Sequence, residues 1–468
     1  MPEPKERTSI QAAAERAVLA AVRLPDARFD PSDPFGELAS LAEQAGATIV
    51  GELSQSLDRP VAGTYMGTGK LVELKSLCDL VDASMVIFDH ELSPKQIAKI
   101  EETVERKIVD RSELILDIFA SRATTHEAKI QVELAQLEYT YPRLRAMWSH
   151  LERITGGSPG GVGTRGPGEQ QLEIDRRLVQ RKKNQLQREL RDLQKRKRRS
   201  VEQRNNEHFT IGLVGYTNAG KSTLFNTLTS GGAYADDRVF ATLMTRTRAW
   251  DLGGGLDVML SDTVGFVRDL PHNLIASFKA TLEEATHADL LLIVLDVSDP
   301  AAELHYDTVM GTLDELFDEV ARAEHAPGEP APSYAPDAGQ SRGDGWTPPP
   351  RLLMLNKADA LADNRELLVW QSRHPDAVVL SALPGDDGRP AVGADALEAV
   401  VRGHVTGPVG EYDVTVPLRD ARTIHTIENR GEVLDRTYDT DRVTLRARLG
   451  SRQVERLRAA GAEVSTSF

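Results

Sequence analysis

Apolar positions in the first quarter of the chain follow two different periods. Short continuous apolar runs predict strands, and segments with apolar residues three to four positions apart predict helices. Strands are expected at 47–50, 85–89 and 107–110, and helices at 69–80 and 93–105. This alternation is typical of a parallel sheet with helices packed on it, so we expect an α/β domain over residues 36–110. Residues 1–35, which are polar and contain prolines, predict a flexible N-terminal arm.

A longer helical pattern follows over residues 111–206. Apolar residues recur every three to four positions up to Tyr141-Pro142, where a proline is expected to end the first helix. A glycine-rich loop comes next, and a second helix is expected from about 169 to 206. Its apolar face is formed by Leu172, Val179, Leu186 and Leu193, with Leu190 beside them. Two long helices joined by one loop predict an antiparallel helical hairpin.

Residues 207–403 contain five apolar runs separated by helical patterns, which predicts a doubly wound α/β domain. The runs lie at 210–214, 257–260, 290–295, 352–355 and 377–380. Proline and glycine supply eleven of the twenty-five positions in 326–350, so a disordered surface insertion is expected there. Residues 404–468 alternate as strands do and end in a helical pattern, which predicts a small α+β domain. The chain as a whole is expected to be of the α/β class.

Charge is unevenly distributed along the 468 residues. The formal net charge of −15 argues, by itself, against a nucleic-acid partner. From Arg176 to Arg199, however, twelve Lys or Arg residues stand against two acids, which gives a local charge of +10. This local charge is a better guide to partners than the net charge of the whole chain, and it predicts contacts with RNA phosphates. A solvated helix face is the alternative interpretation.

Several features bear on location and assembly. The N-terminus lacks the apolar core of a signal peptide, and no apolar run approaches the length of a membrane span. The single cysteine, Cys78, excludes an intramolecular disulfide. We therefore expect a cytoplasmic protein without a membrane span, and a monomer is the default oligomeric state.

The sharpest chemical signal is a phosphate-binding loop, or P-loop, between a predicted strand and a predicted helix. Its glycines let several backbone N–H groups face one phosphate chain. Lys221 can reach the β and γ phosphates, and the Ser222 hydroxyl can hold Mg²⁺. The full pattern in this context argues against a chance glycine-rich turn. The nucleotide-binding residues expected here are Gly215, Tyr216, Thr217, Asn218, Ala219, Gly220, Lys221, Ser222 and Thr223.

The segment Asn356-Lys357-Ala358-Asp359 indicates that the base is guanine, and so the ligand is GTP or GDP. The Asp359 carboxylate can accept hydrogen bonds from N1–H and N2–H of guanine, a donor pair that adenine lacks. Asn356 can bond the base edge or brace the P-loop, and the Lys357 stem can lie along the ring. Ser381 and Ala382, after the last predicted strand, suit a backbone contact to the guanine O6.

Two segments between these motifs are candidates for metal binding and catalysis. Asp262 can hold the Mg²⁺ shell, and the Gly265 N–H can meet the γ-phosphate and sense its loss. Thr242 can coordinate Mg²⁺ when GTP is bound, with Thr245 and Thr247 as alternatives. The expected metal ligands are thus Ser222, Thr242 and Asp262, and the expected catalytic residues are Lys221, Asn218, Gly265 and Thr242.

The residue after Gly265 is Phe266, where a Ras-like enzyme has a glutamine that positions water. Phenylalanine cannot orient water by hydrogen bonding, so slow intrinsic hydrolysis is expected unless help comes from elsewhere. Asn218 is one source of help, because its side-chain oxygen can hold a monovalent cation such as K⁺ near the β–γ bridge. The alternative is that Asn218 only braces the loop.

These motifs resemble those of HflX-type GTPases of the Obg–HflX group. The resemblance rests on GYTNAGKSTLFN, DTVGFVRDLPHNLIASFKATLEE and NKAD, and on the upstream blocks FDHELSPKQ, IVDRSELILDIFASRATTHEAKIQVELAQLEY and GVGTRGPGEQQLEIDRR. It covers most of residues 40–300, and the upstream blocks are specific because related GTPases carry other N-terminal domains. One departure is ATLMTRTR, where the family usually has ATLDPTTR, so that Met244-Thr245 replaces Asp-Pro.

The resemblance implies that 207–403 is a GTPase domain in a ribosome-associated protein. Such proteins bind the large ribosomal subunit and its rRNA, and help to split or rescue stalled ribosomes. The residues expected to contact RNA are Arg153, Arg165, Arg176, Arg177, Arg181, Lys182 and Lys183. Two other functions stay open: an NTP-dependent RNA-remodelling protein, and a slow-turnover GTP-binding module for another partner.

Overall fold

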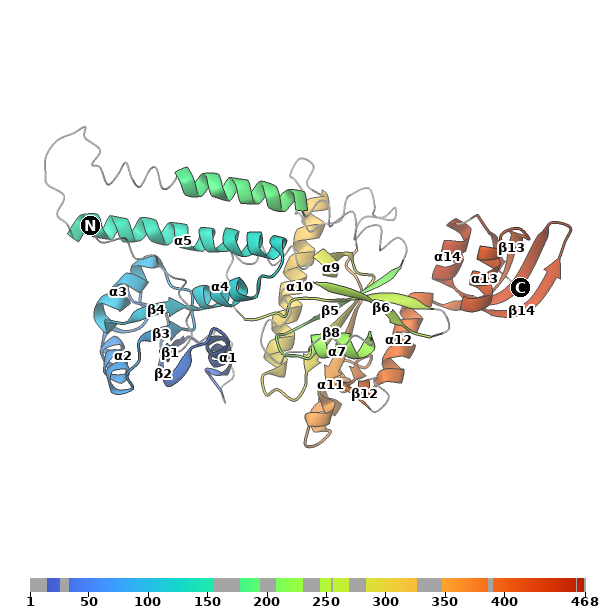
Figure 1. The fold of residues 1–468 in the computed structure, drawn as a ribbon. Helices are drawn as coiled ribbons and strands as arrows, with labels where there is room; N and C mark the ends of the chain where they lie inside the picture. The colour runs from blue at the N-terminus through green and yellow to red at the C-terminus, as the bar shows by residue number, and fades with distance from the viewer. Residues whose placement is uncertain are drawn as a thin grey trace.

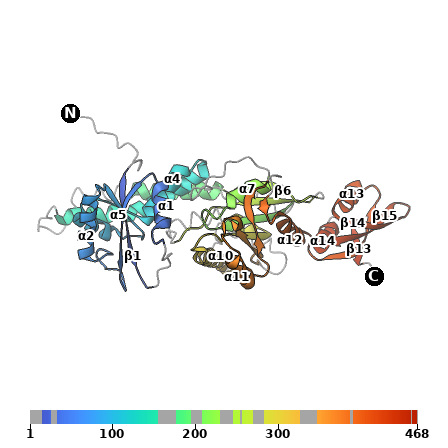
Figure 2. The same cartoon turned by 90° about the horizontal axis from the view of Figure 1, so that it is seen from below.

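The computed structural model describes most of the chain. The described residues are 15–25, 33–154, 177–193, 208–229, 245–253, 256–268, 283–325, 347–385, 390–459 and 461–466. An N-terminal domain, a central domain and a C-terminal domain lie in a row, and a helical hairpin lies alongside the first (Figures 1 and 2).

The N-terminal domain is a four-stranded parallel sheet in the order β2-β1-β3-β4. Its strands are β1 (Arg16–Arg23), β2 (Thr48–Ser56), β3 (Met85–Phe88) and β4 (Lys107–Asp110). Helices α1 (Gly36–Gln44) and α4 (Arg111–Arg122) pack on one face of the sheet, and α2 (Thr68–Leu80) and α3 (Pro94–Val104) pack on the other. Each face therefore buries its own apolar cluster.

The expected N-terminal arm over residues 1–35 is wrong for residues 16–23, which form β1. This strand lies between β2 and β3, and its residues Ala17–Val22 are fully buried. Six consecutive apolar residues bounded by two arginines are the signal of a strand buried on both faces. The run is short and lies within a mostly polar segment, so the composition of residues 1–35 as a whole does not indicate a strand.

The helical hairpin pairs α5 (His126–Ile154) with a helix at residues 177–193. Leu186 and Leu190 of the second helix pack on Ile130 and Leu134 of the first. The two helices are antiparallel, as the contacts of His126 with Glu189 and of Glu133 with Lys182 show. The rest of the expected second helix lies outside the described residues.

The first helix of the hairpin differs from the sequence expectation in two ways. The pattern from residue 111 onward is two helices, α4 and α5, because the chain turns at Ala123 and Thr125 then accepts a hydrogen bond from Ala128 N at the start of α5. The helix also continues past Pro142 to Ile154. A proline removes only one helical hydrogen bond, and contacts of Tyr139 and Arg143 with Asp110 hold the chain on both sides of it.

The central domain contains a six-stranded sheet in the order β10-β9-β8-β5-β7-β6. The strands are β5 (Phe209–Gly215), β6 (Arg246–Asp251), β7 (Asp257–Asp262), β8 (Leu290–Asp296), β9 (Arg351–Asn356) and β10 (Val378–Val379). Only β6 is antiparallel to its neighbour. Helices α10 (Ala302–His325) and α11 (Arg365–Arg373) cover one face, and α7 (Lys221–Leu228) and α12 (Ala394–Thr406) cover the other.

The α/β class expected from the sequence is confirmed, with one strand more in the central sheet than the five apolar runs predicted. The extra strand, β6, is an edge strand whose residues other than Trp250 are exposed or half-buried, so no apolar run marks it. Short elements complete the domain: α9 (Glu283–His287), a 3₁₀ turn (Ala358–Ala360), β11 (Ser381–Pro384) and β12 (Pro390–Val392). Most of the expected disordered insertion, 326–346, lies outside the described residues, and Pro350 already accepts a hydrogen bond from Leu291 N at 2.9 Å.

The C-terminal domain is an antiparallel sheet in the order β14-β15-β13-β16, with two helices on one face. Its elements are β13 (Val409–Pro417), α13 (Ala421–Arg430), β14 (Glu432–Tyr438), β15 (Arg442–Gly450), α14 (Ser451–Ala459) and β16 (Glu463–Thr466). Helix α12 leads into this domain from the central one. Across the described part of the chain, every helix is too short or too polar to cross a membrane.

The N-terminal and central domains share one apolar cluster. Side chains of α1 and α4 belong to the same buried group as Phe266, Leu291 and Val309 of the central domain. A continuous apolar contact of this kind fixes the relative position of the two domains, and thus of the segments that carry their polar residues.

Candidate nucleotide-binding site

The P-loop joins the end of β5 to the start of α7, and two of its glycines are required by close contacts. A Cβ on Gly215 would lie 2.2 Å from the Val294 carbonyl oxygen, and one on Gly220 would lie 2.2 Å from Asn356 Nδ2. Gly220 also has a φ of +94°, which favours glycine. The loop is therefore held tightly against β8 and β9, with the N-terminus of α7 behind it.

Lys221 is folded onto the loop itself. Its Nζ donates to the carbonyl oxygens of Gly215, at 3.0 Å, and of Tyr216, at 2.6 Å. Burial lowers the pKa of Lys221 to about 8, and the nearby Asp262 carboxylate opposes that shift. A phosphate would offer this ammonium a better partner than two carbonyl groups, so the buried lysine is poised to bind one.

The oxygens that fit a magnesium ion lie together. Ser222 Oγ donates to Asp262 Oδ2 at 2.8 Å, and Asp262 is fully buried at the end of β7. A hydroxyl and a carboxylate are the hard oxygen donors that Mg²⁺ prefers, so the pair fits the ion. Of the expected third ligands, Thr242 lies outside the described residues, and Thr247 in β6 is bonded to Ser261 Oγ at 3.0 Å.

Asn356 connects the segment expected to select the base to the P-loop. Its Nδ2 donates to the Ala219 carbonyl at 2.7 Å, and its Oδ1 accepts from Ala382 N at 2.9 Å. Of the two roles open to this side chain, the described contacts are those of a brace. A backbone contact from Ala382 to guanine O6 would have to share its N–H with Asn356, and Ser381 beside it is buried.

Lys357 and Asp359 lie close together at the turn after β9. Lys357 has a φ of +60°, and its Nζ lies 2.6 Å from Asp296 Oδ2. Left-handed backbone costs a lysine energy, and such strain is found at ligand sites. Asp359 is exposed in the 3₁₀ turn, so its carboxylate is accessible to a base. Asp296, at the end of β8, is a site residue that the sequence analysis missed.

The backbone around Gly265 pairs with the P-loop. Phe266 N donates to the Gly215 carbonyl at 3.0 Å, and Thr217 N donates to the Phe266 carbonyl at 2.7 Å. A Cβ on Gly265 would lie 3.0 Å from Lys221 Nζ and 2.9 Å from the Thr217 Cα. The expected γ-phosphate sensor thus lies directly beside Lys221, the lysine expected to bind the phosphates.

Known proteins with similar sequences cover nearly the whole chain. Family models described as "GTP-binding GTPase N-terminal", "GTP-binding GTPase Middle Region" and "50S ribosome-binding GTPase" match residues 32–120, 122–204 and 210–325. A GTPase HflX from Magnetococcus marinus is 37% identical over 448 residues, which cover 95% of each chain. The chain belongs to the HflX family of GTPases. Its expected family and its expected activity, GTP hydrolysis, are thereby confirmed.

A second relative agrees with this assignment. The GTPase HflX of Escherichia coli is 38% identical over 412 residues, 88% of this chain and 87% of its own. Among solved structures, a GTP-binding protein from Sulfolobus solfataricus in complex with GDP aligns with 84% of this chain and 98% of its own, at 23% identity and a TM-score of 0.40.

In this HflX-family protein, Phe266 stands where a Ras-like enzyme has its water-positioning glutamine, and Asn218 is the residue expected to help hydrolysis. The two have different surroundings. Phe266 is fully buried in the apolar cluster shared by the two domains. Asn218 is exposed in the P-loop with a φ of +61°, a conformation that asparagine tolerates better than most residues. Thr223 follows Ser222 in the first turn of α7.

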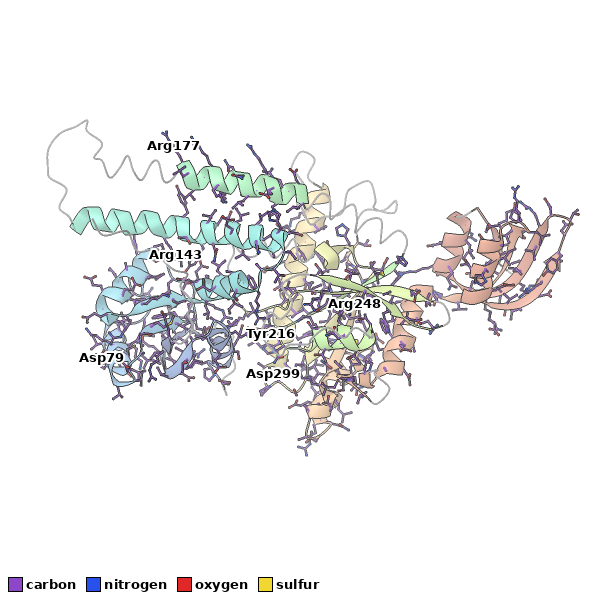
Figure 3. The ribbon with its side chains drawn as sticks, viewed as in Figure 1. Asp79, Arg143, Arg177, Tyr216, Arg248 and Asp299 are labelled. Carbon is purple, nitrogen blue, oxygen red and sulfur yellow. The ribbon has the colours of Figure 1, made fainter. Side chains whose placement is uncertain are left out.

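Tyr216 has its backbone in the P-loop and its side chain elsewhere. The ring stacks on His305 of α10 with centroids 3.8 Å apart, and the hydroxyl accepts a hydrogen bond from Arg268 N at 2.9 Å. Burial raises the pKa of the Tyr216 hydroxyl well above its ordinary value. Figure 3 places this residue at the junction with the N-terminal domain. The sequence contained no sign of this role.

The candidate RNA-contact residues separate into groups. Arg177 and Arg181 are exposed on the second hairpin helix, and the Arg177 side chain points away from α5 (Figure 3). Lys182 and Lys183 instead pair with Glu133 and Glu138 of α5, at 3.1 and 2.8 Å. Arg165 and Arg176 lie outside the described residues, as does the side chain of Arg153.

Proposed function

We propose that this HflX-family GTPase binds the large ribosomal subunit through the outer face of the helix at 177–193. Nucleotide state controls that binding: GTP favours the bound state, and hydrolysis releases the protein. Its role on the ribosome is to split or rescue stalled particles. The printed description of the family model for residues 210–325, a 50S ribosome-binding GTPase, supports this choice of partner.

The observation that carries the proposal is an arginine stripe. Residues three, four or seven positions apart lie on one face of a helix, and Arg177, Arg181, Arg188 and Arg191 are separated by four, seven and three positions. Leu186 and Leu190, which pack on α5, lie on the opposite face. The stripe thus faces outward, where guanidinium groups can contact the phosphates of an rRNA helix.

The two lysines of the same helix have a different role in the proposal. Lys182 and Lys183 lie on the flank of the helix and pair with acids of α5. The arginines of the stripe lie on the face opposite to α5, so they, rather than these lysines, are assigned the RNA contacts.

The proposal also assigns residues of the nucleotide site to the metal ion, the phosphates and the base. Ser222 and Asp262 hold Mg²⁺, Lys221 and the P-loop N–H groups hold the phosphates, and the Asp359 carboxylate selects guanine. Asn218 holds K⁺ near the β–γ bridge, where the cation offsets charge that develops on hydrolysis. The exposure of Asn218 and the 2.8 Å contact between Ser222 and Asp262 support these assignments.

The test is binding of the full chain to purified large subunits in the presence of a non-hydrolysable GTP analogue. The double variant Arg181→Ala/Arg188→Ala should bind at least about tenfold more weakly and show a shallower salt dependence, by about one unit of slope for each phosphate that the variant no longer neutralises. Lys182→Ala/Lys183→Ala is the matched control, because it removes the same charge from the same helix. Equal losses in both variants, or no loss in the first, would refute the arginine stripe.

A further inference from the structure

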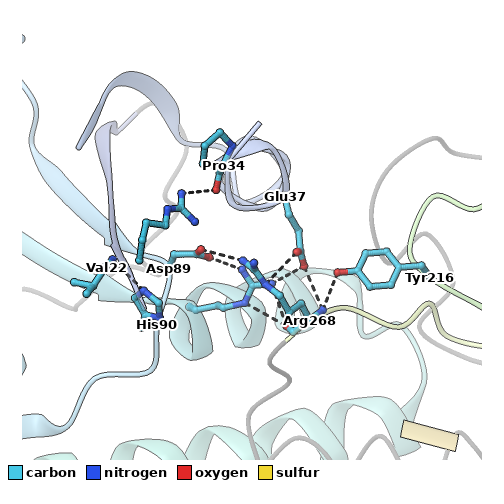
Figure 4. Close-up of polar contacts among 9 residues, drawn as sticks. Val22, Pro34, Glu37, Asp89, His90, Tyr216 and Arg268 are labelled. Carbon is cyan, nitrogen blue, oxygen red and sulfur yellow. Dashed lines mark hydrogen bonds and ion pairs between the residues drawn. The ribbon is translucent and has the colours of Figure 1, made fainter. Parts of the chain in front are cut away.

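A cluster of four charges, two of them buried and two partly buried, joins the N-terminal domain to the segment after Gly265. Arg268 Nη2 lies 2.9 Å from Asp89 Oδ2, and its Nε lies 3.7 Å from Glu37 Oε2. Arg111 Nη1 lies 2.7 Å from Asp89 Oδ1, and its Nη2 lies 2.5 Å from Glu37 Oε1. Figure 4 shows Arg268 between the acids of the N-terminal domain and Tyr216 of the P-loop.

The cluster forms hydrogen bonds with the backbone of Arg268 as well as ion pairs with its side chain. Arg268 N donates to Glu37 Oε1 at 3.3 Å, and the Arg268 carbonyl accepts from Arg111 Nε and Nη2 at 3.3 and 3.0 Å. Arg111 and Asp89 are almost fully buried. Two positive and two negative charges in so little water hold one another in a fixed arrangement, since separating any pair exposes an uncompensated charge.

The same backbone position reaches the nucleotide site by two routes. Arg268 N donates to the Tyr216 hydroxyl, so the N-terminal domain and the P-loop share one anchoring residue. Two residues earlier, Phe266 exchanges hydrogen bonds with Gly215 and Thr217. Gly265 therefore sits on a short span whose far end is fixed by the N-terminal domain.

The near end of that span is also fixed, because Thr263 Oγ1 donates to the Leu213 carbonyl at 2.6 Å in the buried sheet. Between this contact and the hydrogen bonds of Phe266 with the P-loop lie Val264 and Gly265, so these two residues have the fewest backbone restraints in the span. Arg268 follows Gly265 by three residues, and a Cβ on Gly265 would lie 3.0 Å from Lys221 Nζ, so the span held by Arg268 lies next to the P-loop lysine.

We infer that Arg268 is a positioning residue that makes the preference for GTP over GDP depend on the N-terminal domain. By its contacts with Asp89 and Glu37 it holds the Gly265 N–H where the γ-phosphate of GTP can accept from it. GDP has no γ-phosphate, so its binding does not depend on this position. The inference rests on the proposed contact between Gly265 and the γ-phosphate, and it is independent of the ribosome.

The test compares affinities of the full chain for GDP and for a non-hydrolysable GTP analogue. Arg268→Ala should weaken binding of the analogue by about tenfold or more, within the range of measured couplings between sites, and leave GDP binding within about twofold. Arg268→Lys, which keeps the charge, should recover part of the loss. Arg106→Ala is the control, because Arg106 pairs with Asp79 at 2.7 Å in the N-terminal domain without contacting the cluster.

A second variant guards against a simple loss of folding. Asp89→Asn/Arg268→Gln removes one acid and one base, so the remaining pair of Glu37 and Arg111 stays matched. It should show the same selective loss of analogue binding. Equal losses for GDP and the analogue would assign the cluster a purely structural role, and unchanged or stronger analogue binding would also overturn the inference.

Gly265→Ala separates failure of the inference from failure of the underlying contact. Its added Cβ would meet Thr217 and Lys221, so it should weaken binding of the analogue more than binding of GDP. If Gly265→Ala acts selectively and the Arg268 variants do not, the positioning role alone is refuted. If Gly265→Ala affects both nucleotides equally, the γ-phosphate contact itself is wrong, and the inference falls with it.

Discussion

The amide of Asn356 donates a hydrogen bond to the Ala219 carbonyl at 2.7 Å, across 137 residues of sequence. Its oxygen accepts from Ala382 N, so one fully buried side chain joins three segments of the nucleotide site. The segment proposed to select the base and the loop proposed to bind the phosphates are thereby held at a fixed distance. We expect the binding of both GTP and GDP to depend on this distance.

Replacing Asn356 with alanine should weaken GTP and GDP binding together and destabilise the GTPase domain. Two buried backbone groups would lose their partners, at about 1–3 kcal/mol each. Denaturant unfolding of the nucleotide-free protein measures the loss. Asn364→Ala is the control, because Asn364 is exposed and makes no side-chain cap to α11. Equal stability of the two variants would show that the brace is dispensable.

The Asp359→Asn variant should exchange guanine for xanthine as the preferred base. The carboxylate accepts from N1–H and N2–H of guanine, whereas an amide can donate to the extra carbonyl that xanthine carries. Loss of such matched bonds costs affinity by about 10⁴-fold in sites built on hydrogen bonding. Competition of XTP and GTP for the variant measures the exchange. Because Asp359 is exposed, thermal stability should not change, and retained GTP preference would refute its role.

Nucleotide binding should weaken as pH rises above about 8. Lys221 has a pKa of about 8 without nucleotide, and the phosphates of a bound nucleotide raise it. Binding then takes up a proton above pH ~8, so affinity falls by up to about tenfold per pH unit, whereas below pH ~7 the lysine is protonated in both states. Calorimetry in two buffers with different ionisation enthalpies measures that proton. Constant affinity between pH ~7 and ~9 would contradict the assignment.

The Glu113→Gln variant should be more stable than the wild type at pH ~8 and similar to it at pH ~5. Burial first, and then Asp110 and Asp117, raise the pKa of Glu113 to about 7. The folded state binds the proton more tightly than the unfolded state, so stability falls as pH rises from about 4.5 to 7. The amide avoids this loss, which is at most about 3 kcal/mol. Thermal midpoints measure the difference.

The matched control for this variant is Glu102→Gln, at an exposed position of α3. It should leave the thermal midpoint unchanged at both pH values. A Glu113→Gln variant that is equally stabilised at both pH values would show that its effect does not come from the carboxyl proton.

Local motifs made it predictable from the sequence that the segments of the candidate nucleotide site lie together. The P-loop and the segment from Asn356 to Asp359 each lie in one short stretch at the end of a strand, and a parallel sheet brings strand ends together. The buried strand β1 was equally local, but its six apolar residues were averaged with polar neighbours. Thr125 is a residue type that commonly caps the start of a helix, but the helical spacing of apolar residues continues across it and gives no sign of a break.

Contacts between distant segments could not be predicted in the same way. Glu37 and Arg268 are separated by 231 residues, and nothing in either neighbourhood marks them as partners. Tyr216 belongs to a recognisable motif, yet its ring serves the domain junction because the P-loop turns it toward α10. Spacing along the chain identifies residues that share an element, whereas partners across domains depend on how whole sheets pack.

The most direct test of the proposed function is the rate of GTP hydrolysis with and without purified large ribosomal subunits, in potassium buffer. The account predicts slow turnover by the protein alone, because Phe266 is buried and cannot position water, and stimulation by about tenfold or more when subunits are added. Replacing potassium with sodium should reduce the stimulated rate. An unchanged slow rate in the presence of large subunits would contradict the ribosome-activated switch.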